Sequence, residues 1–193
     1  MIREFIYYSK NAVTAGNFIK DNLMKAGRMD IVCNVFIQGF FISNNIRKDV
    51  RMHMIFDGPP KPGVHLIFDF SKVSKNGISK KDIAGLIKRM LYKCPDKGIN
   101  EVFPGCFVER KPFEILIKEL DKEGKNVFVL DEKGKDIREL ELKGNEVFVL
   151  GDQDGFPGKE RFLKNIDKIS VSNKVLFASQ VLVIINNEID RIK

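Results

Sequence analysis

Two short stretches near the end of the chain combine a predicted buried strand with residues that let a ligand approach the main chain. The first is V-F-V-L-G-D-Q-D-G-F-P, in which the apolar residues 147–150 are followed at once by Gly151. This run is too short for a helix and rich in β-branched and aromatic residues, so it predicts a buried strand. Asp152, Asp154 and Gly155 then predict a strand-to-loop turn. In an open α/β sheet, ligands bind at strand ends of this kind.

The second stretch repeats this arrangement and continues as a helix. Residues 166–171 predict another buried strand, which ends in small polar residues that include Ser170 and Asn173. Residues from Leu176 to Glu188 follow the three-and-four spacing of an amphipathic helix. On periodicity alone, this pattern fits a ligand site and a simple packing unit of strand and helix equally well.

The central part of the chain places two further acidic residues directly after predicted strands. Residues 50–56 have β character and lead into F-D-G-P-P-K-P-G, so Asp57 follows that strand. Residues 64–68 predict a similar strand, and Asp69 follows it. Each carboxylate could accept a proton from a bound substrate, or it could form the turn after its strand.

The remaining segments predict an α/β fold with a largely parallel sheet, because strands and helices alternate along the chain. The other predicted strands cover residues 2–8 and 126–130, and the other predicted helices cover residues 17–26, 30–41, 79–92 and 113–121. Residues 94–111 contain two prolines, two glycines and only short apolar runs, so we expect a long functional loop there. Residues 133–143 predict an exposed polar segment that could hold a short hairpin. Neither G-x-G-x-x-G nor G-x-x-x-x-G-K-[ST] occurs, so the two commonest phosphate loops are absent.

The composition fits one domain without a metal site. The 193 residues are 44% hydrophobic, which is enough for a substantial core. No apolar run reaches transmembrane length and the first residues lack the layout of a signal peptide, so we expect a soluble cytoplasmic protein with no membrane partner. Cys33, Cys94 and Cys106 have no paired spacing, and His53 and His65 are the only histidines, so we expect neither a disulfide nor a metal. Both histidines are expected at strand edges and not as catalytic bases.

The charge points to a polyanionic partner. The formal net charge is +7, and the basic excess is concentrated between Arg47 and Lys111. Such an excess is typical of proteins that bind nucleic acid. Lysine-rich surfaces are also common in proteins adapted to high temperature, so charge alone leaves both explanations open.

Several motifs together resemble one known family. V-F-V-L-D, V-F-V-L-G-D-Q-D-G-F-P and I-S-V-S-N-K-V-L-F-A-S-Q resemble the cofactor-binding motifs of the SPOUT class of RNA methyltransferases. F-I-Y-Y-S, S-N-N-I-R-K-D-V-R-M-H and F-D-G-P-P, taken with L-G-D-Q-D-G-F, look like the archaeal tRNA pseudouridine N1-methyltransferase family. This resemblance covers nearly the full chain.

The resemblance implies a fold and a set of partners that sequence physics does not supply. It implies a single domain over residues 1–193, with a mostly parallel sheet, helices on both faces and a trefoil knot within about residues 126–193. It also implies a homodimer, S-adenosylmethionine held in the knot, and tRNA containing pseudouridine as substrate. By their places in the motifs, the implied cofactor-binding residues are Leu130, Gly151, Lys174, Val175, Leu176, Phe177, Ala178, Ser179 and Val181.

The implied reaction is N1-methylation of pseudouridine at position 54, in the T-loop of tRNA. Methyl transfer from a sulfonium to a ring nitrogen requires donor and acceptor to be held in line and one proton to be removed. Asp69 and Asp57 are the candidates for the base, and Arg47 is the candidate for stabilising charge on the ring carbonyls. Either aspartate could instead be structural. Asp152 and Asp154 could contact ribose hydroxyls or cap their own turn.

RNA binding is expected to depend on contacts between basic side chains and phosphates. The predicted contacts are Arg47, Arg51, Lys72, Lys75, Lys80 and Lys81. Two alternatives remain open at this stage. The substrate could be pseudouridine in ribosomal RNA, or the chain could be a non-catalytic RNA-binding or ribosome-assembly factor that retains the basic surface.

Overall fold

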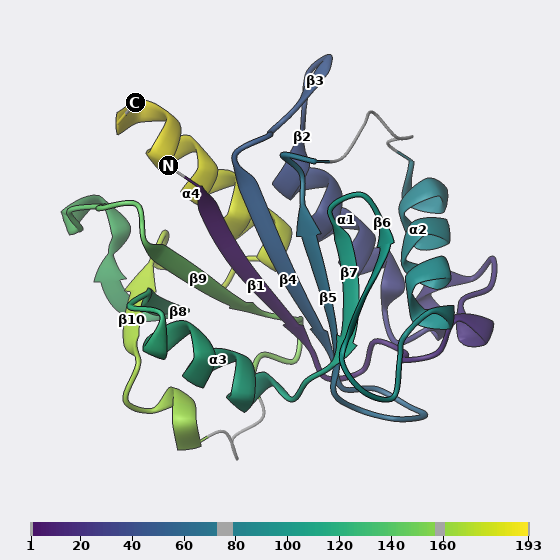
Figure 1. The fold of residues 1–193 in the computed structure, drawn as a ribbon. Coiled ribbons are helices and arrows are strands. Elements are labelled where there is room, and N and C mark those ends of the chain that lie inside the picture. Colours follow the sequence, from purple (N-terminus) through teal and green to yellow (C-terminus); the bar gives the residue numbers. More distant parts are fainter. Residues whose placement is uncertain (1, 73–78, 157–160, 193) are drawn as a thin grey trace.

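The computed structural model describes residues 2–72, 79–156 and 161–192, and these residues form one eight-stranded sheet with helices on both faces (Figure 1). The strand order is β10-β8-β9-β1-β4-β5-β7-β6. The strands are β1 (Arg3–Ser9), β4 (Val50–Phe56), β5 (Val64–Asp69), β6 (Ile99–Phe103), β7 (Cys106–Arg110), β8 (Asn126–Asp136), β9 (Glu146–Gly151) and β10 (Asp167–Ser170). A separate small hairpin consists of β2 (Phe41–Ile42) and β3 (Asn45–Ile46).

The sheet has a parallel half and an antiparallel half. The five neighbouring strands from β10 to β4 are parallel, which confirms the predicted α/β class. From β4 to β6 the pairing is antiparallel. The connections explain this change, because seven residues link β4 to β5 and two link β6 to β7. A parallel crossover needs a dozen or more residues.

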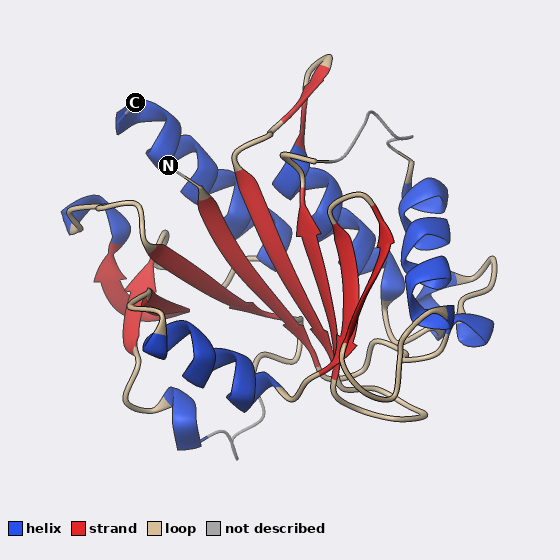
Figure 2. Cartoon of the chain, viewed as in Figure 1, coloured by secondary structure: helices blue, strands red, loops and turns tan. Residues whose placement is uncertain are grey.

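Helices cover the two faces unequally (Figures 1 and 2). One face is covered by α1 (Met29–Phe40), α2 (Lys80–Tyr92) and α4 (Ala178–Ile192), and the other by α3 (Phe113–Lys122). Short 3₁₀ turns occupy Gly16–Phe18, Leu23–Lys25, Ile137–Glu139 and Arg161–Leu163. Within the described ranges, no helix is long and apolar enough to cross a membrane.

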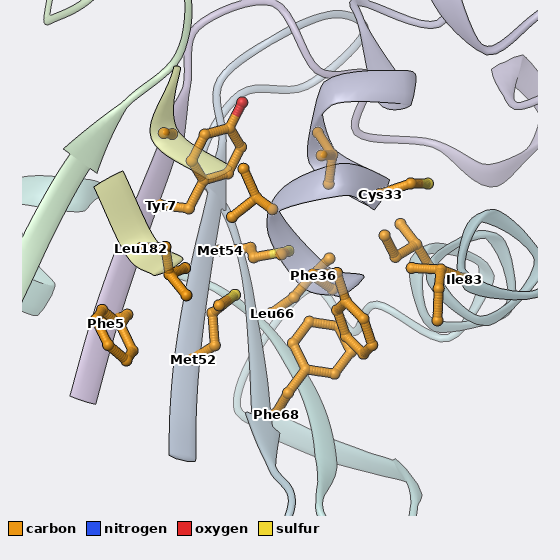
Figure 3. Packing of buried hydrophobic residues seen from close by; sticks show 14 of the residues in the cluster. Phe5, Tyr7, Cys33, Phe36, Met52, Met54, Leu66, Phe68, Ile83 and Leu182 are labelled. Atoms are coloured by element: carbon orange, nitrogen blue, oxygen red, sulfur yellow. The ribbon is translucent and has the colours of Figure 1, made fainter. Parts of the chain in front are cut away.

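Strand β1 is buried along its whole length because it contributes side chains to both layers of the core. Phe5 and Tyr7 pack in the layer of α1 and α4, whereas Ile6 and Tyr8 pack in the layer of α3. Figure 3 shows Phe5 and Tyr7 beside Leu182 of α4. Burying each such side chain contributes about 1.5–3 kcal/mol, so β1 anchors both layers. This explains why the N-terminal segment reads as a continuous apolar strand.

Helices α2 and α3 form close to where the sequence predicts them. The hydroxyl of Ser79 accepts a hydrogen bond from the backbone N–H of Asp82, and the Asp82 side chain accepts one from the Ser79 N–H, which confirms the predicted capping box. Pro112 is the N-cap of α3 and not its first helical residue. The predicted helix over residues 17–26 is wrong, since that segment contains only two 3₁₀ turns.

The expectation of a long loop over residues 94–111 is also wrong. Residues Ile99–Phe103 and Cys106–Arg110 form the hairpin of β6 and β7. Cys106 and Val108 are buried while their neighbours are more exposed. The sequence C-F-V-E-R does not alternate between apolar and polar residues, so periodicity did not reveal this strand. The hairpin considered for residues 133–143 does not form, because β8 continues to Asp136 and a 3₁₀ turn follows.

Candidate functional site

A pocket opens at the carboxyl ends of β9 and β10, beside the middle of β8 (residues 130–132) and the start of α4. Seven of the nine predicted cofactor-binding residues line it: Leu130, Gly151, Lys174, Val175, Leu176, Ala178 and Val181. The other two, Phe177 and Ser179, lie outside the lining, and Phe177 is 61% exposed. Residues from three loops that are distant in sequence therefore meet at one site.

Gly151 brings the main chain to the edge of this pocket. A Cβ atom on Gly151 would lie 3.1 Å from the carbonyl carbon of Gly155 and 3.2 Å from its Cα, which is closer than ordinary van der Waals contact. The turn between them is closed by a hydrogen bond from the Gly155 N–H to the Asp152 carbonyl oxygen at 3.0 Å. Gly155 itself has a φ of 67°, which favours glycine. A side chain at Gly151 must therefore displace this turn.

Asp152 holds the same loop against the end of β1. One carboxylate oxygen accepts hydrogen bonds from the Ser9 hydroxyl and the Lys10 N–H, both at 3.0 Å, and the other accepts one from the Asp154 N–H at 2.9 Å. Burial raises the pKa of Asp152, and these hydrogen bonds oppose that shift. Capping of the turn, one of the two roles predicted for Asp152, is thus observed. A contact with ribose hydroxyls stays a prediction.

The opposite wall is a polar turn between β10 and α4. The Ser170 hydroxyl accepts a hydrogen bond from the Ser172 N–H at 3.2 Å and donates one to the Ser172 carbonyl oxygen at 2.7 Å. The Lys174 N–H donates to the Ser172 hydroxyl at 3.1 Å. These local hydrogen bonds keep the segment out of the helix until Ala178.

The lining has the composition of a nucleoside pocket. Leu130, Ile169 and Leu176 are among the apolar residues that can enclose a planar ring, and Asp152 and Lys174 supply opposite charges at its rim. A larger cavity of about 610 Å³, compared with about 250 Å³ here, lies between α3 and the amino ends of β8 and β10. Volume alone would favour the larger cavity. The open carboxyl ends of parallel strands and the glycine turn favour the smaller one.

The three predicted catalytic residues do not meet within one chain. Because β4 and β5 are antiparallel, Asp57 and Asp69 lie at opposite edges of the sheet. The Asp57 N–H donates to the Ser9 carbonyl oxygen at 2.9 Å, so Asp57 shares the edge that carries the pocket. Asp69 is paired with Arg51 near the start of β4, roughly 20 Å away along strands of this length.

Asp57 and Asp69 both have structural contacts. One oxygen of Asp57 accepts a hydrogen bond from the Gly63 N–H at 2.9 Å, which closes the turn between β4 and β5. Asp69 accepts hydrogen bonds from the Ser71 N–H, the Ser71 hydroxyl and the Arg51 guanidinium. Burial raises the pKa of Asp69, but the hydrogen bonds from Ser71 and Arg51 outweigh it, so the pKa lies below its usual value.

Arg47 also lies at the amino edge of the parallel strands, with its guanidinium bound to a carboxylate. Its two terminal nitrogens donate to the two oxygens of Asp190 at 3.0 and 2.7 Å. Asp190 also accepts a hydrogen bond from Arg3 at 2.5 Å. The hydrogen bond from Arg47 is the main cause that lowers the Asp190 pKa to about 2. Arg47 therefore ties the last turns of α4 to the segment between β3 and β4, and Arg3 ties them to the start of β1.

The predicted RNA-binding residues fall into two groups. Arg47 and Arg51 form ion pairs with Asp190 and Asp69, whereas Lys72, Lys80 and Lys81 are exposed at the amino edge. Lys75 lies outside the described residues. None of the five described cations in this set is on the edge that carries the pocket.

Two features were not anticipated from the sequence. His53 and His65 are buried on inner strands, so the expectation of strand-edge positions was wrong, and they connect Glu4 to Glu109 through hydrogen bonds of 2.8 to 2.9 Å. The alternation in R-M-H-M-I-F could have placed His53 on a core face, but its partners lie on other strands. The second feature is the loop of residues 9–14, which borders the pocket and is described below.

Metal and thiol chemistry find little support in the described ranges. No group of three or more His, Cys, Asp or Glu side chains is arranged there to hold a metal ion. Burial raises the pKa of Cys33 and of Cys106 to about 12. Thiols with such a pKa are weak nucleophiles near neutral pH.

Comparison with known proteins identifies the family of the chain. A family model described as "Putative SAM-dependent RNA methyltransferase" matches residues 2–193. The chain is 34% identical to a tRNA (pseudouridine(54)-N(1))-methyltransferase of Methanocaldococcus jannaschii, over 98% of this chain and 97% of the relative. It is 32% identical to the protein of the same name from Methanococcus aeolicus, over 98% of each chain.

Among solved structures, Archaeoglobus fulgidus Nep1 bound to S-adenosylhomocysteine has a similar fold. The TM-score is 0.67 at 13% sequence identity, over 100% of this chain and 99% of that one. The likeness at this identity concerns the fold alone. These findings confirm the resemblance drawn from the sequence motifs. The chain belongs to the family of S-adenosylmethionine-dependent RNA methyltransferases and has the α/β fold of the SPOUT class.

Proposed function

We propose that this protein methylates N1 of pseudouridine 54 in the T-loop of tRNA, with S-adenosylmethionine as methyl donor. The observation that carries the proposal is the full-length match, at 30–35% identity, to relatives that bear this activity in their names. The pocket supports it, since seven of the nine residues assigned to the cofactor from sequence motifs line one cavity.

Different residues of the pocket would hold different parts of the cofactor. The bound cofactor supplies a methyl group on a positively charged sulfonium. Apolar residues such as Leu130 and Leu176 would enclose its adenine, Gly151 allows the main chain to approach its ribose, and Lys174 would attract its carboxylate. The acidic side of the pocket, which includes Asp152, favours the positive charges of the ligand.

The proton on N1 of pseudouridine needs an acceptor in the site. Asp57 is the candidate that lies on the same edge as the pocket, and one of its oxygens is bound to the Gly63 N–H. Asp69 and Arg47 are at the other edge of the same chain. They can act on the substrate only if a second copy brings that edge to the pocket.

We propose that the protein works as such a homodimer. Val175, Phe177 and Val183 lie beside or just after the pocket segment and are 82%, 61% and 44% exposed. Clusters of exposed apolar side chains of this kind mark interaction surfaces. A second copy seated here would cover them and bring its own cations close to the pocket. The approach of the loop after β9 to the segment after β10 supports the further proposal that residues 126–193 are knotted.

Two measurements test the proposed activity. Isothermal titration calorimetry should detect binding of S-adenosylmethionine to the folded protein without RNA, and an absence of heat at millimolar cofactor contradicts the proposal. Tritium should pass from labelled cofactor to tRNA that carries pseudouridine 54, and tRNA with uridine at that position should stay unlabelled.

The control for substrate is a ribosomal RNA fragment that contains pseudouridine. Label in that fragment and none in tRNA would assign the enzyme to ribosomal RNA. Cofactor binding without transfer to either RNA would indicate a non-catalytic RNA-binding or assembly factor.

A further inference from the structure

The loop that follows β1, residues 9–14, forms the rim between the cofactor pocket and Asp57. The strand order β9-β1-β4 places Asp152, Lys10 and Asp57 at three successive strand ends. We propose that Lys10 is a substrate-positioning residue whose ammonium group binds a phosphate of the RNA next to the target nucleotide. This inference rests on the proposed function, because it takes RNA as the ligand.

The cofactor loop fixes the near side of this rim. The carboxylate of Asp152, which lines the pocket, accepts hydrogen bonds from the Ser9 hydroxyl and the Lys10 N–H at 3.0 Å. Asp154 accepts one from the Asn11 side-chain amide at 2.7 Å. Within the rim, the Ala12 N–H donates to the Ser9 hydroxyl at 3.2 Å. The main chain of Lys10 is therefore coupled directly to a wall of the pocket.

Two glycines and a second loop fix the far side. A Cβ atom at Gly58 would lie 2.3 Å from the Asn11 carbonyl oxygen, and one at Gly27 would lie 1.7 Å from it, so both positions exclude side chains. The Thr14 hydroxyl donates to the Gly58 carbonyl oxygen at 3.2 Å and accepts from the Lys61 N–H at 3.0 Å. Residues held this firmly at a ligand edge are suited to positioning a substrate.

The ammonium group of Lys10 is available, although its backbone is held. Its side chain is exposed and makes no hydrogen bond or ion pair within the parts of the chain that the structure describes. By contrast, Arg47 and Arg51 at the amino edge already bind carboxylates. An unpaired cation on a fixed loop attracts a phosphate without first breaking an ion pair.

The position of Lys10 favours RNA over the cofactor as its ligand. Lys174 lines the pocket itself and can serve the carboxylate of the cofactor, whereas Lys10 lies outside the lining, beyond Asp152. From β10 to β1 there are three strand spacings, roughly 14 Å, so the two lysines flank the pocket from opposite sides. Phosphate contacts at such a flank set the register of the RNA without reading its sequence.

The test measures binding of a T-arm hairpin RNA that carries pseudouridine, over a series of salt concentrations. Lys10→Ala should weaken RNA binding several-fold at low salt. It should also make the plot of the logarithm of the association constant against the logarithm of the salt concentration shallower by about one. Lys10→Arg should keep the slope. Lys122→Ala is the matched control, since Lys122 is exposed in the last turn of α3 and its loss changes the net charge equally.

Steady-state kinetics distinguish a role of Lys10 in positioning the RNA from a role in the chemical step or in cofactor binding. Lys10→Ala should raise KM for RNA, with kcat at saturating RNA and the Kd for S-adenosylmethionine unchanged. An unchanged salt slope, an equal effect of Lys122→Ala, or a loss of cofactor affinity overturns the inference. RNA binding is measured without turnover, so the two proposals can fail separately. If Lys10→Ala reduces the salt slope as expected but the wild-type protein transfers no methyl group, the proposed function is overturned and the role of Lys10 stands.

Discussion

The imidazole rings of His53 and His65 stack inside the sheet with their centroids 5.1 Å apart, and Nδ1 of His53 lies 2.8 Å from Nε2 of His65. The other nitrogen of each ring faces a carboxylate, Glu4 or Glu109, at 2.9 Å. Three hydrogen bonds need three N–H groups, so the fully bonded pair carries one positive charge between two ionised carboxylates. Lys125 binds the other carboxylate oxygen of Glu4, and Lys111 binds the same oxygen of Glu109 as His65 does. The network crosses β1, β4, β5 and β7.

Acid should destabilise the protein through this network. Burial lowers the pKa of His65 to about 4, from an ordinary value of 6.5. Between pH 4 and 6.5 the unfolded state binds more protons than the folded state. The contribution of His65 to the free energy of unfolding is therefore fully present above pH 6.5 and is lost as the pH falls toward 4. The loss can reach about 3 kcal/mol, since one pKa unit corresponds to about 1.4 kcal/mol.

Urea unfolding at pH 7, 5.5 and 4.5 checks this expectation. His65→Gln should be less stable than the wild type at pH 7 and should lose less stability between pH 7 and 4.5. An identical pH dependence in the variant and the wild type would exclude His65 as the cause.

Neutralising Glu4 should lower the free energy of unfolding more than neutralising most other acidic side chains. Glu4 is 2% exposed, accepts hydrogen bonds from His53 at 2.9 Å and Lys125 at 2.5 Å, and has its pKa lowered to about 2 because these partners outweigh its burial. Glu4→Gln should cost about 3–5 kcal/mol, because it leaves a buried charge without its partner. Glu114→Gln, which removes the exposed pair with Lys118, should cost little and serves as the control. Equal losses in the two variants would contradict the role assigned to the network.

Gly151→Val should abolish cofactor binding and leave the protein folded. The new side chain would meet the backbone of Gly155 at the pocket rim, whereas the same substitution at Gly85 would meet no heavy atom within 4 Å. Calorimetry with S-adenosylmethionine measures the difference, and circular dichroism checks the fold. Normal affinity in Gly151→Val would mean that the loop after β9 is only structural.

Asp57→Asn and Asp69→Asn should separate the two candidate bases. Replacing the aspartate that accepts the proton should slow single-turnover methylation by about two to four decades. Cofactor affinity should be retained, and the residual rate should rise with pH. A structural aspartate should lower Tm and leave the rate nearly normal. If neither change slows the reaction, a carboxylate base is not part of the mechanism.

Mixing two inactive variants tests whether a site is shared between subunits. If Asp69 of one copy acts at the pocket of another, Asp69→Asn mixed with Gly151→Val should recover about a quarter of wild-type activity, because half of the randomly formed dimers contain one intact site of two. No recovery, in a sample shown to exchange subunits, would place all catalytic residues in one chain and favour Asp57.

Local features were predictable where one segment contains all the information that determines them. The apolar run before Gly151 could only be a buried strand, and Ser79 with Asp82 has the spacing of a capping box, so both were correctly predicted. The motifs around Leu130, Gly151 and Lys174 also indicated segments that line one pocket in the structure. Short spacing, turn residues and motif likeness were sufficient for these assignments.

Relations between distant segments depended on the tertiary structure. Asp57 and Asp69 follow similar strands in the sequence, yet the antiparallel pairing of β4 with β5 sends them to opposite edges. His53 and His65 looked like strand-edge residues until neighbouring strands supplied Glu4 and Glu109 as partners. By itself the sequence determined the strands that border the pocket, the glycine turn and the family. Strand order and direction, which depend on contacts between remote residues, decided which of its acids and lysines lie beside the pocket and which partners its histidines have.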